Sequence, residues 1–294
     1  MKIAIQTFRL QEWFGDDIRS VVDLVRRMEE IGVDQVEAPD HIVIGEDRSN
    51  YPYGKPRTAL DYPWYDPISL LSAIAAVTTR IRLSTGILVS PVRPAPLLAK
   101  QLATLDHLSG GRVDIGIGVG WQKLEYDASS ISWERRFSRM TDQIRACKAL
   151  WTQAPATHHG EFYSFDRAYS MPLPVQPGGV PVWFGFALTD KNLDRIAELG
   201  DGWLPAERRP AALAPDIQRI KEAMAARGRD PSKLQVRCVL GPAAGEGRDP
   251  LEALNRIPEY AAAGVTTLAF NTHDYCTRPE EIEGLFKAAT AAAA

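Results

Sequence analysis

The feature that most constrains this chain is a repeated alternation of short β-rich runs with amphipathic helical segments. In the first unit, residues 3–5 predict a strand, and apolar residues between 18 and 31 recur at every third or fourth position. That spacing places them on one face of a helix. Gly32 follows, and glycine ends helices at low cost because it accepts a left-handed conformation. Alternation of this kind is typical of a parallel sheet covered by helices.

Seven more units follow along the chain. The expected strands share a short apolar pattern and span 34–38, 81–87, 113–117, 180–184, 202–204, 234–240 and 267–270. The expected helices have helical apolar spacing and span 67–77, 97–108, 137–150, 191–199, 213–226, 251–263 and 279–289. Eight units predict an α/β fold in which residues 1–294 form a single (β/α)8 TIM barrel. A doubly wound open sheet is the alternative.

Two stretches are longer than a minimal barrel needs, and we place insertions after strands 2 and 4. Residues 44–65 hold three prolines, four tyrosines and one tryptophan, and predict an aromatic-lined pocket. Residues 155–179 include Gly160-Glu161-Phe162-Tyr163, which predicts a small hairpin. Long insertions in barrels commonly form lids or substrate walls.

Charge and cysteine content exclude several classes of protein. The formal net charge is -3 and charges of both signs are mixed along the chain, so we expect no nucleic-acid partner. Cys147, Cys238 and Cys276 are odd in number and far apart, which argues against a disulfide framework or a structural zinc site. No apolar run is long enough to span a bilayer and no secretory signal precedes the first strand, so we expect a cytoplasmic protein without a membrane partner.

The sharpest polar pair is Asp40-His41, directly after the second strand. Chemistry in a (β/α)8 barrel occurs where strands end, and an imidazole there can exchange a proton near neutral pH while a neighbouring carboxylate orients it. The alternative is structural, with Asp40 capping a turn. A metal site would need convergent ligands, for which Glu37, Asp40, His41 and His273 are the only conceivable set, and we predict no metal.

Two glycine-containing segments also lie at expected strand ends. Gly116, Gly118 and Gly120 alternate along the fourth strand, so a flat ring or a backbone could approach that face closely; tight packing is the alternative. Residues 185–189 precede a helix, and free amides at a helix N-terminus can bind phosphate. The alternative there is an ordinary N-cap by Thr189 or Asp190.

Several motifs strongly resemble the bacterial-luciferase-like superfamily. They cover roughly residues 2–205 and comprise Thr85-Gly86-Ile87-Leu88-Val89, residues 96–106, Leu108-Ser109-Gly110-Gly111-Arg112, Gly116-Ile117-Gly118-Val119-Gly120-Trp121, Pro39-Asp40-His41, residues 181–185 and residues 198–203. Within this superfamily the chain looks most like the branch that uses the deazaflavin coenzyme F420, especially from Tyr51-Pro52-Tyr53 to Pro67.

The resemblance implies an oxidoreductase that transfers hydride between F420 and a small organic substrate. The alternative is an FMN-dependent monooxygenase on the same scaffold. His41 matches the histidine beside the reactive ring, and Asp40 matches the acidic residue that binds the polar edge of the ring. Gly86-Ile87 matches a bulge with a non-proline cis peptide, for which a trans bulge is the alternative.

The implied cofactor contacts are completed by residues of strand ends and of the phosphate loop, namely Thr85, Val89, Gly118, Trp121, Gly185, Phe186, Ala187, Leu188 and Thr189. In F420-dependent sugar dehydrogenases of this superfamily a glutamate acts as the acid at the position of Trp121, which argues against a sugar substrate here. We also expect the chain to form a homodimer.

Overall fold

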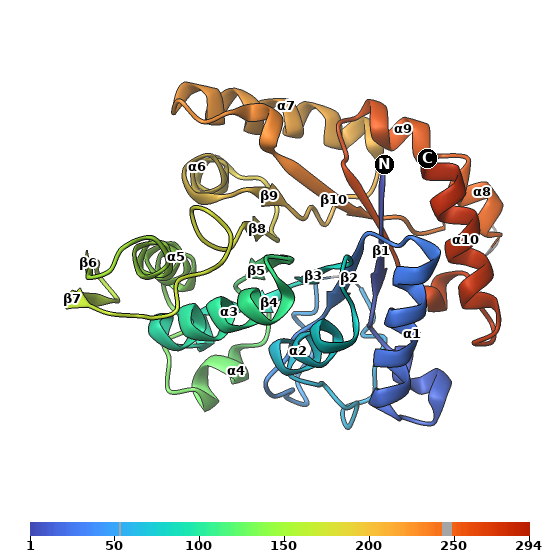
Figure 1. Cartoon of the computed structure of the whole chain (residues 1–294), viewed down its shortest axis with the longest axis horizontal. Helices are drawn as coiled ribbons and strands as arrows, with labels where there is room; N and C mark the ends of the chain where they lie inside the picture. Colours follow the sequence, from blue (N-terminus) through green and yellow to red (C-terminus); the bar gives the residue numbers. More distant parts are fainter. Residues whose placement is uncertain (53, 243–248) are drawn as a thin grey trace.

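The computed structural model describes residues 1–52, 54–242 and 249–294. Within them, eight parallel strands close into a barrel, with helices around the outside (Figure 1). The order around the barrel is β1 (Lys2–Gln6), β2 (Gln35–Ala38), β3 (Arg82–Thr85) with its continuation β4 (Leu88–Val89), β5 (Val113–Gly118), β8 (Val182–Phe184), β9 (Gly202–Trp203), β10 (Gln235–Val239) and β11 (Thr267–Phe270). Because β11 pairs with β1 and β3 pairs with β5, the sheet closes. The TIM barrel is confirmed and the open-sheet alternative is wrong.

The helices follow the strands as the apolar spacing predicts. They are α1 (Ile18–Ile31), α2 (Pro67–Val77), α3 (Ala95–Ser109), α5 (Arg136–Thr152), α6 (Asp190–Leu199), α7 (Pro210–Ala226), α8 (Pro250–Leu254), α9 (Ile257–Ala262) and α10 (Glu281–Ala293). Gly32 ends α1 with a φ of 103°, as expected. The single helix expected over 251–263 is wrong, because it breaks between α8 and α9, where Pro258 lies in the first turn of α9. Proline lacks an N–H and therefore suits a first turn better than a helix interior.

The two long stretches have different places in the fold. Residues 39–66 connect β2 to α2 at the carboxyl ends of the strands, without a helix or strand among the described residues. The predicted hairpin forms as β6 (Ala156–His159) and β7 (Ser164–Ala168). Asp142 of α5 accepts hydrogen bonds from the backbone N–H groups of Phe162 (2.6 Å) and Tyr163 (3.0 Å). The hairpin therefore packs on the outer side of α5, away from the barrel strands (Figure 1).

The interior of the barrel contains a polar layer. Arg237 is 2% exposed and its Nη2 lies 2.5 Å from Oε2 of Glu37, which is 4% exposed. Arg237 also donates to Gln35 and Ser84, at 3.0 Å each. Burial lowers the pKa of the guanidinium below its ordinary value. A charge buried this deeply is tolerated because several partners replace its water shell. Among the described residues, no helix has the length and apolar character that crossing a bilayer requires.

Candidate active site at the carboxyl ends of the strands

Asp40 and His41 are neighbours in sequence, but their side chains have separate partners. Oδ2 of Asp40 accepts from the backbone N–H of Val89 (2.8 Å) and from Nη1 of Arg93 (2.7 Å), and Oδ1 accepts from Nη2 of Arg93 (2.9 Å). Both carboxylate oxygens are therefore occupied by a bidentate arginine contact. Asp40 ties the end of β2 to the segment after β4. This geometry favours the structural interpretation of Asp40 and shows that its carboxylate does not face His41.

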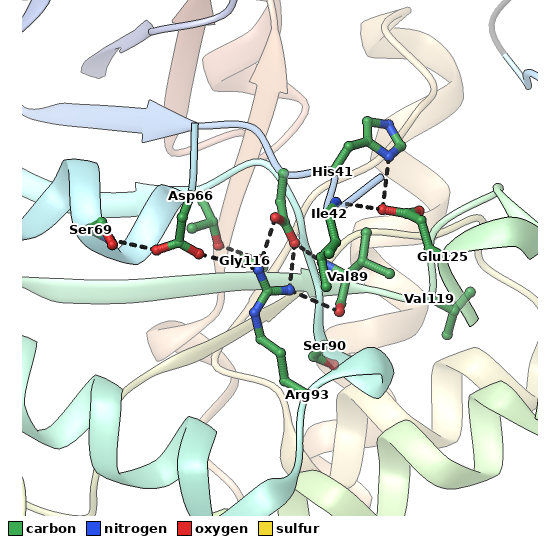
Figure 2. A network of polar contacts seen from close by, with 12 residues as sticks. His41, Ile42, Asp66, Ser69, Val89, Ser90, Arg93, Gly116, Val119 and Glu125 are labelled. Atoms are coloured by element: carbon green, nitrogen blue, oxygen red, sulfur yellow. Dashed lines mark hydrogen bonds and ion pairs between the residues drawn. The ribbon is translucent and has the colours of Figure 1, made fainter. Parts of the chain in front are cut away.

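The carboxylate that faces His41 belongs to Glu125 on α4 (Lys123–Ala128), as Figure 2 shows. Oε1 of Glu125 lies 3.2 Å from Nδ1 of His41 and accepts a second hydrogen bond, at 2.9 Å, from the backbone N–H of Ile42. The Glu125 side chain is fully buried. Our reading of the sequence missed Glu125. Its one available signal is its place in a short segment directly after β5, where side chains reach the carboxyl ends of the strands.

Aromatic rings gather around His41. The imidazole meets Trp64 edge-on with 4.6 Å between ring centroids, and it meets Trp121 in the same way at 5.6 Å. Trp64 stacks on Phe8 at 5.8 Å, and Tyr51 lies 5.2 Å from Trp121. Tyr51 and Trp64 come from the 44–65 insertion, whose Tyr53 lies outside the described residues. The insertion therefore supplies an aromatic wall beside His41.

Ile87 lies against two other predicted site residues, Gly118 and Gly185, which come from two other strand ends. The Gly86–Ile87 peptide is cis, as predicted, and the trans alternative is wrong. A Cβ added to Gly118 would lie 2.7 Å from Cδ1 of Ile87, and one added to Gly185 would lie 2.3 Å from its Cγ2. Ile87 thus fills the space that these glycines leave open. Tight packing explains Gly116 as well, because a Cβ there would lie 2.0 Å from the carbonyl oxygen of Thr85.

The loop at 185–189 leads into α6. The Thr189 side chain accepts from the backbone N–H of Asn192 at 3.3 Å, so the N-cap given as the alternative is present. Nδ2 of Asn192 donates to the carbonyl of Ala187 at 2.9 Å, which holds the loop in place. Across the described part of the chain, the backbone N–H groups of residues 186–188 have no hydrogen-bond acceptor. A capped helix end and an available set of amides occur here together.

The four residues that could have formed a metal site do not converge. In the described ranges, no three His, Cys, Asp or Glu side chains come together in a way that could hold a metal ion. His273 is near the strand ends, where its Nδ1 accepts a hydrogen bond from Trp13 at 3.2 Å. Burial, reinforced by the charge of Arg9, lowers the pKa of His273 to about 4. The other three have partners of their own: Glu37 pairs with Arg237, Asp40 with Arg93, and His41 with Glu125.

Two cavities lie elsewhere in the molecule. One, of about 420 Å³, lies between α5, α6 and the β6–β7 hairpin, and includes Arg145 and Arg195 in its lining. The other, of about 430 Å³, lies at the amino ends of the strands and includes Trp183 and Gln235. Neither contains a predicted site residue. The site at the strand ends is therefore defined by its residues: His41 lies against Trp121, and Ile87 lies against Gly118 and Gly185.

Comparison with known proteins places the chain in a family. Residues 4–284 match the family described as luciferase-like monooxygenases. An uncharacterized protein of Mycobacterium tuberculosis (strain ATCC 25618 / H37Rv) is 42% identical over 166 residues, which are 56% of this chain and 58% of the relative. The FMNH2-dependent dimethylsulfone monooxygenase of Pseudomonas putida is 36% identical over 115 residues, covering 38% of this chain and 31% of that protein.

Among solved structures, an F420-dependent secondary alcohol dehydrogenase in complex with an F420-acetone adduct superposes with a TM-score of 0.79. It has 17% sequence identity, and the match covers 100% of this chain and 99% of that one, so it shares the fold. The chain spans little more than half the length of the Mycobacterium relative that it matches. The family match covers nearly all of the barrel, including every strand end described above. The chain therefore belongs to the luciferase-like monooxygenase family.

Proposed function

We propose that this protein is an oxidoreductase that transfers hydride between coenzyme F420 and a small organic substrate, with His41 as the group that supplies or removes the accompanying proton. The observation that carries the proposal is that only one of the two imidazole nitrogens has a hydrogen-bond partner among the described residues. Glu125 holds Nδ1, whereas Nε2 makes no hydrogen bond within the described part of the chain. The ring lies between Trp64 and Trp121 at the end of a barrel strand. Nε2 is therefore available to a bound molecule.

The residues present fit a flat cofactor with a polar edge. Buried polar atoms normally have partners, and those that do not are candidates for ligand contacts. Near the ends of β1 and β11 and in the 39–66 connection, the described residues leave four such atoms without a partner: Thr7 Oγ1, Gln11 Nε2, Trp64 Nε1 and Thr272 Oγ1. The carbonyl and imide groups of a flavin or deazaflavin ring offer both acceptors and a donor to such atoms. This supports a ring-shaped cofactor at the strand ends.

The proposed contacts of the cofactor divide into a ring part and a phosphate part. Gly86 and Ile87 would lie against the ring, and Thr85, Val89, Gly118 and Trp121 would complete its surroundings. The amides of residues 186–188 and the N-terminus of α6 would hold a phosphate, because oriented N–H groups and the helix dipole both favour an anion. Asp40 would act indirectly, by fixing Val89 through the contacts described above.

The protein's own part in the reaction is to move one proton. F420, when bound, supplies or accepts the hydride and does not support oxygen activation. When a carbonyl substrate is reduced, Nε2 of protonated His41 donates a proton to the carbonyl oxygen; in the opposite direction, Nε2 accepts it. Trp121 carries no acidic proton, so His41 is the group that we assign to this transfer.

An FMN-dependent monooxygenase is the second candidate. It is favoured by the similarity to the dimethylsulfone monooxygenase of Pseudomonas putida, which uses reduced FMN according to its name. The two candidates share the ring site and the phosphate seat. They differ in the cofactor that binds and in whether dioxygen is consumed.

Fluorescence titration of the apoprotein with F420 and with FMN distinguishes the two candidates. We expect tighter binding of F420. The variant Ala187→Pro, which lacks one of the free N–H groups, should weaken F420 binding but leave binding of the phosphate-free deazaflavin headgroup unchanged. FMN binding without F420 binding would replace our proposal by the second candidate. Equal effects of Ala187→Pro on the binding of both deazaflavins would show that the phosphate does not bind at this loop.

A further inference from the structure

Glu125 is the buried carboxylate whose surroundings are least complete. Its side chain is fully buried, and Oε2 has no hydrogen-bond partner among the described residues. Both of its contacts are to Oε1, from Nδ1 of His41 and from the backbone N–H of Ile42. In the part of the chain that the structure describes, it makes no ion pair with a lysine or arginine. Burying a carboxylate without a permanent cation is costly, so its retention needs a reason beyond stability.

The chemistry of the contact determines which nitrogen of His41 carries hydrogen. A carboxylate oxygen can only accept, so Nδ1 must be the donor when the two groups are hydrogen-bonded. The neutral imidazole then has its lone pair on Nε2, and the protonated imidazole has an N–H there. The second donor, the N–H of Ile42, converges on the same oxygen and holds it in place.

Among the residues that the structure describes, no other charged group offers His41 the same interaction. Asp40 is committed to Arg93, as described above, and His41 is otherwise flanked by the edges of Trp64 and Trp121. Gly120, with a φ of +65°, is part of the turn between β5 and α4, and a Cβ there would lie 2.9 Å from Val89 and 3.5 Å from Oε2 of Glu125. A side chain at position 120 would therefore reach Val89 and the carboxylate of Glu125, and glycine leaves that side of the carboxylate uncovered.

We propose that Glu125 is the positioning residue of the active site, which fixes His41 with hydrogen on Nδ1 and supplies the counter-charge when the imidazole is protonated. The inference rests on the proposed function for its catalytic consequence. As a carbonyl is reduced, its π bond breaks, hydride forms the C–H bond and the Nε2 proton forms the O–H bond. The substrate gains two electrons, the cofactor loses them, and His41 is left neutral with its Nδ1–H still donated to Glu125.

The structural part is tested on the apoprotein by long-range 1H–15N spectra of its histidine side chains. His41→Asn assigns the His41 signals by their disappearance. We expect neutral His41 to show the Nδ1–H form in the unmodified protein and in Glu125→Gln, whose amide oxygen can still accept. Glu125→Leu removes the acceptor, and His41 should then populate the Nε2–H form. A folded Glu125→Leu protein that keeps the Nδ1–H form would overturn the proposal, as would an Nε2–H form in the unmodified protein.

The catalytic part is tested by comparing turnover in the same variants. Glu125→Gln keeps the hydrogen bond but removes the counter-charge, and we expect turnover to fall roughly 10- to 100-fold, as for the carboxylate partners of metal-binding histidines. Glu125→Asp, which keeps the charge, should recover part of the loss. Unchanged turnover in Glu125→Gln would remove the counter-charge role.

The chain offers a matched control in a second His–carboxylate pair. Nε2 of His158 lies 2.8 Å from Oδ1 of Asp142, between β6 and α5 and apart from the strand ends. Asp142→Asn should change the His158 signals and leave both the His41 signals and turnover unaltered. The spectra need no cofactor, so they remain informative if F420 does not bind. Failure of the cofactor proposal appears only in the titrations described above.

Discussion

The interior of the barrel and the carboxyl ends of its strands both bury charged side chains, but the buried carboxylates Glu37 and Glu125 differ in whether an arginine lies beside them. Inside, Arg237 has Glu37, Gln35 and Ser84 as partners. At the strand ends, Glu125 has an unpaired carboxylate oxygen and Trp64 an unpaired N–H within the described residues. Complete polar networks make a fold rigid, whereas incomplete ones are stable only where something else provides the missing partner. The comparison supports the proposal that the strand ends are the functional region.

Asp40 and His41 lie where these two regions meet. Asp40 is fully paired, because Arg93 and Val89 donate hydrogen bonds to its two carboxylate oxygens. His41 is only partly paired, because Nε2 makes no hydrogen bond in the described part of the chain. Substitutions of paired groups should therefore lower stability, and substitution of His41 should lower turnover.

The largest effect is expected for His41→Asn. The asparagine amide can keep an N–H donor near the position of Nδ1, which preserves the contact with Glu125, but it has no group at the position of Nε2. We expect turnover to fall about 100- to 10,000-fold, the usual contribution of one positioned proton-transfer group. Steady-state kinetics with F420 measures the loss, and urea unfolding measures stability, which should be nearly unchanged. Full turnover in this variant would exclude His41 from proton transfer.

The second effect concerns the barrel interior. Arg237→Met leaves Glu37 as an unpaired buried charge, and we expect unfolding to require about 3–5 kcal/mol less. The double variant Arg237→Met/Glu37→Gln removes that charge and should recover part of the loss. Urea denaturation measures both proteins. Equal stability of the single and double variants would show that the unpaired charge of Glu37 does not cause the loss of stability.

The third effect concerns the packing around Ile87. Gly118→Ala would place a methyl group 2.7 Å from Cδ1 of Ile87, and we expect overpacking to cost about 1–3 kcal/mol of stability. Ile87→Val lacks that Cδ1 atom, so it should partly restore stability when combined with Gly118→Ala. Thermal unfolding of the two single variants and the double variant tests this coupling. Additive effects would indicate that Gly118 and Ile87 do not compete for space.

The most gradual effect is a pH dependence from His273, which is spread over the range between pH 4 and 6.5. Its pKa is lowered from 6.5 to about 4 in the folded protein, chiefly by burial, so the unfolded chain binds a proton more readily. Stability is therefore fully present above pH 6.5 and is lost as the pH falls toward 4, by at most about 1.4 kcal/mol per pH unit. His273→Gln should flatten this dependence in urea unfolding between pH 4 and 6.5. The same slope in the variant would assign the dependence to other groups.

Much of the fold could be predicted because periodicity is a local property. Apolar spacing predicted the barrel, most helix positions and the location of His41 at the end of a strand, and the sequence Gly160-Glu161-Phe162-Tyr163 predicted the hairpin. The spacing predicted one helix where the structure has two, α8 and α9, because Pro258 lies in the first turn of α9. The cis peptide at Gly86–Ile87 followed from the family resemblance.

Only the tertiary structure decided which groups meet at the strand ends. His41 and Glu125 are 84 residues apart, and Asp40 and Arg93 are 53 apart. Adjacent positions such as Asp40 and His41 can point to different neighbours, so their proximity in sequence did not predict their partners. The carboxyl ends of separate strands converge in a closed barrel, and the contacts made there depend on how each loop returns across that end. Local spacing determines the strands, whereas barrel closure determines which loops meet and therefore which carboxylate faces the histidine.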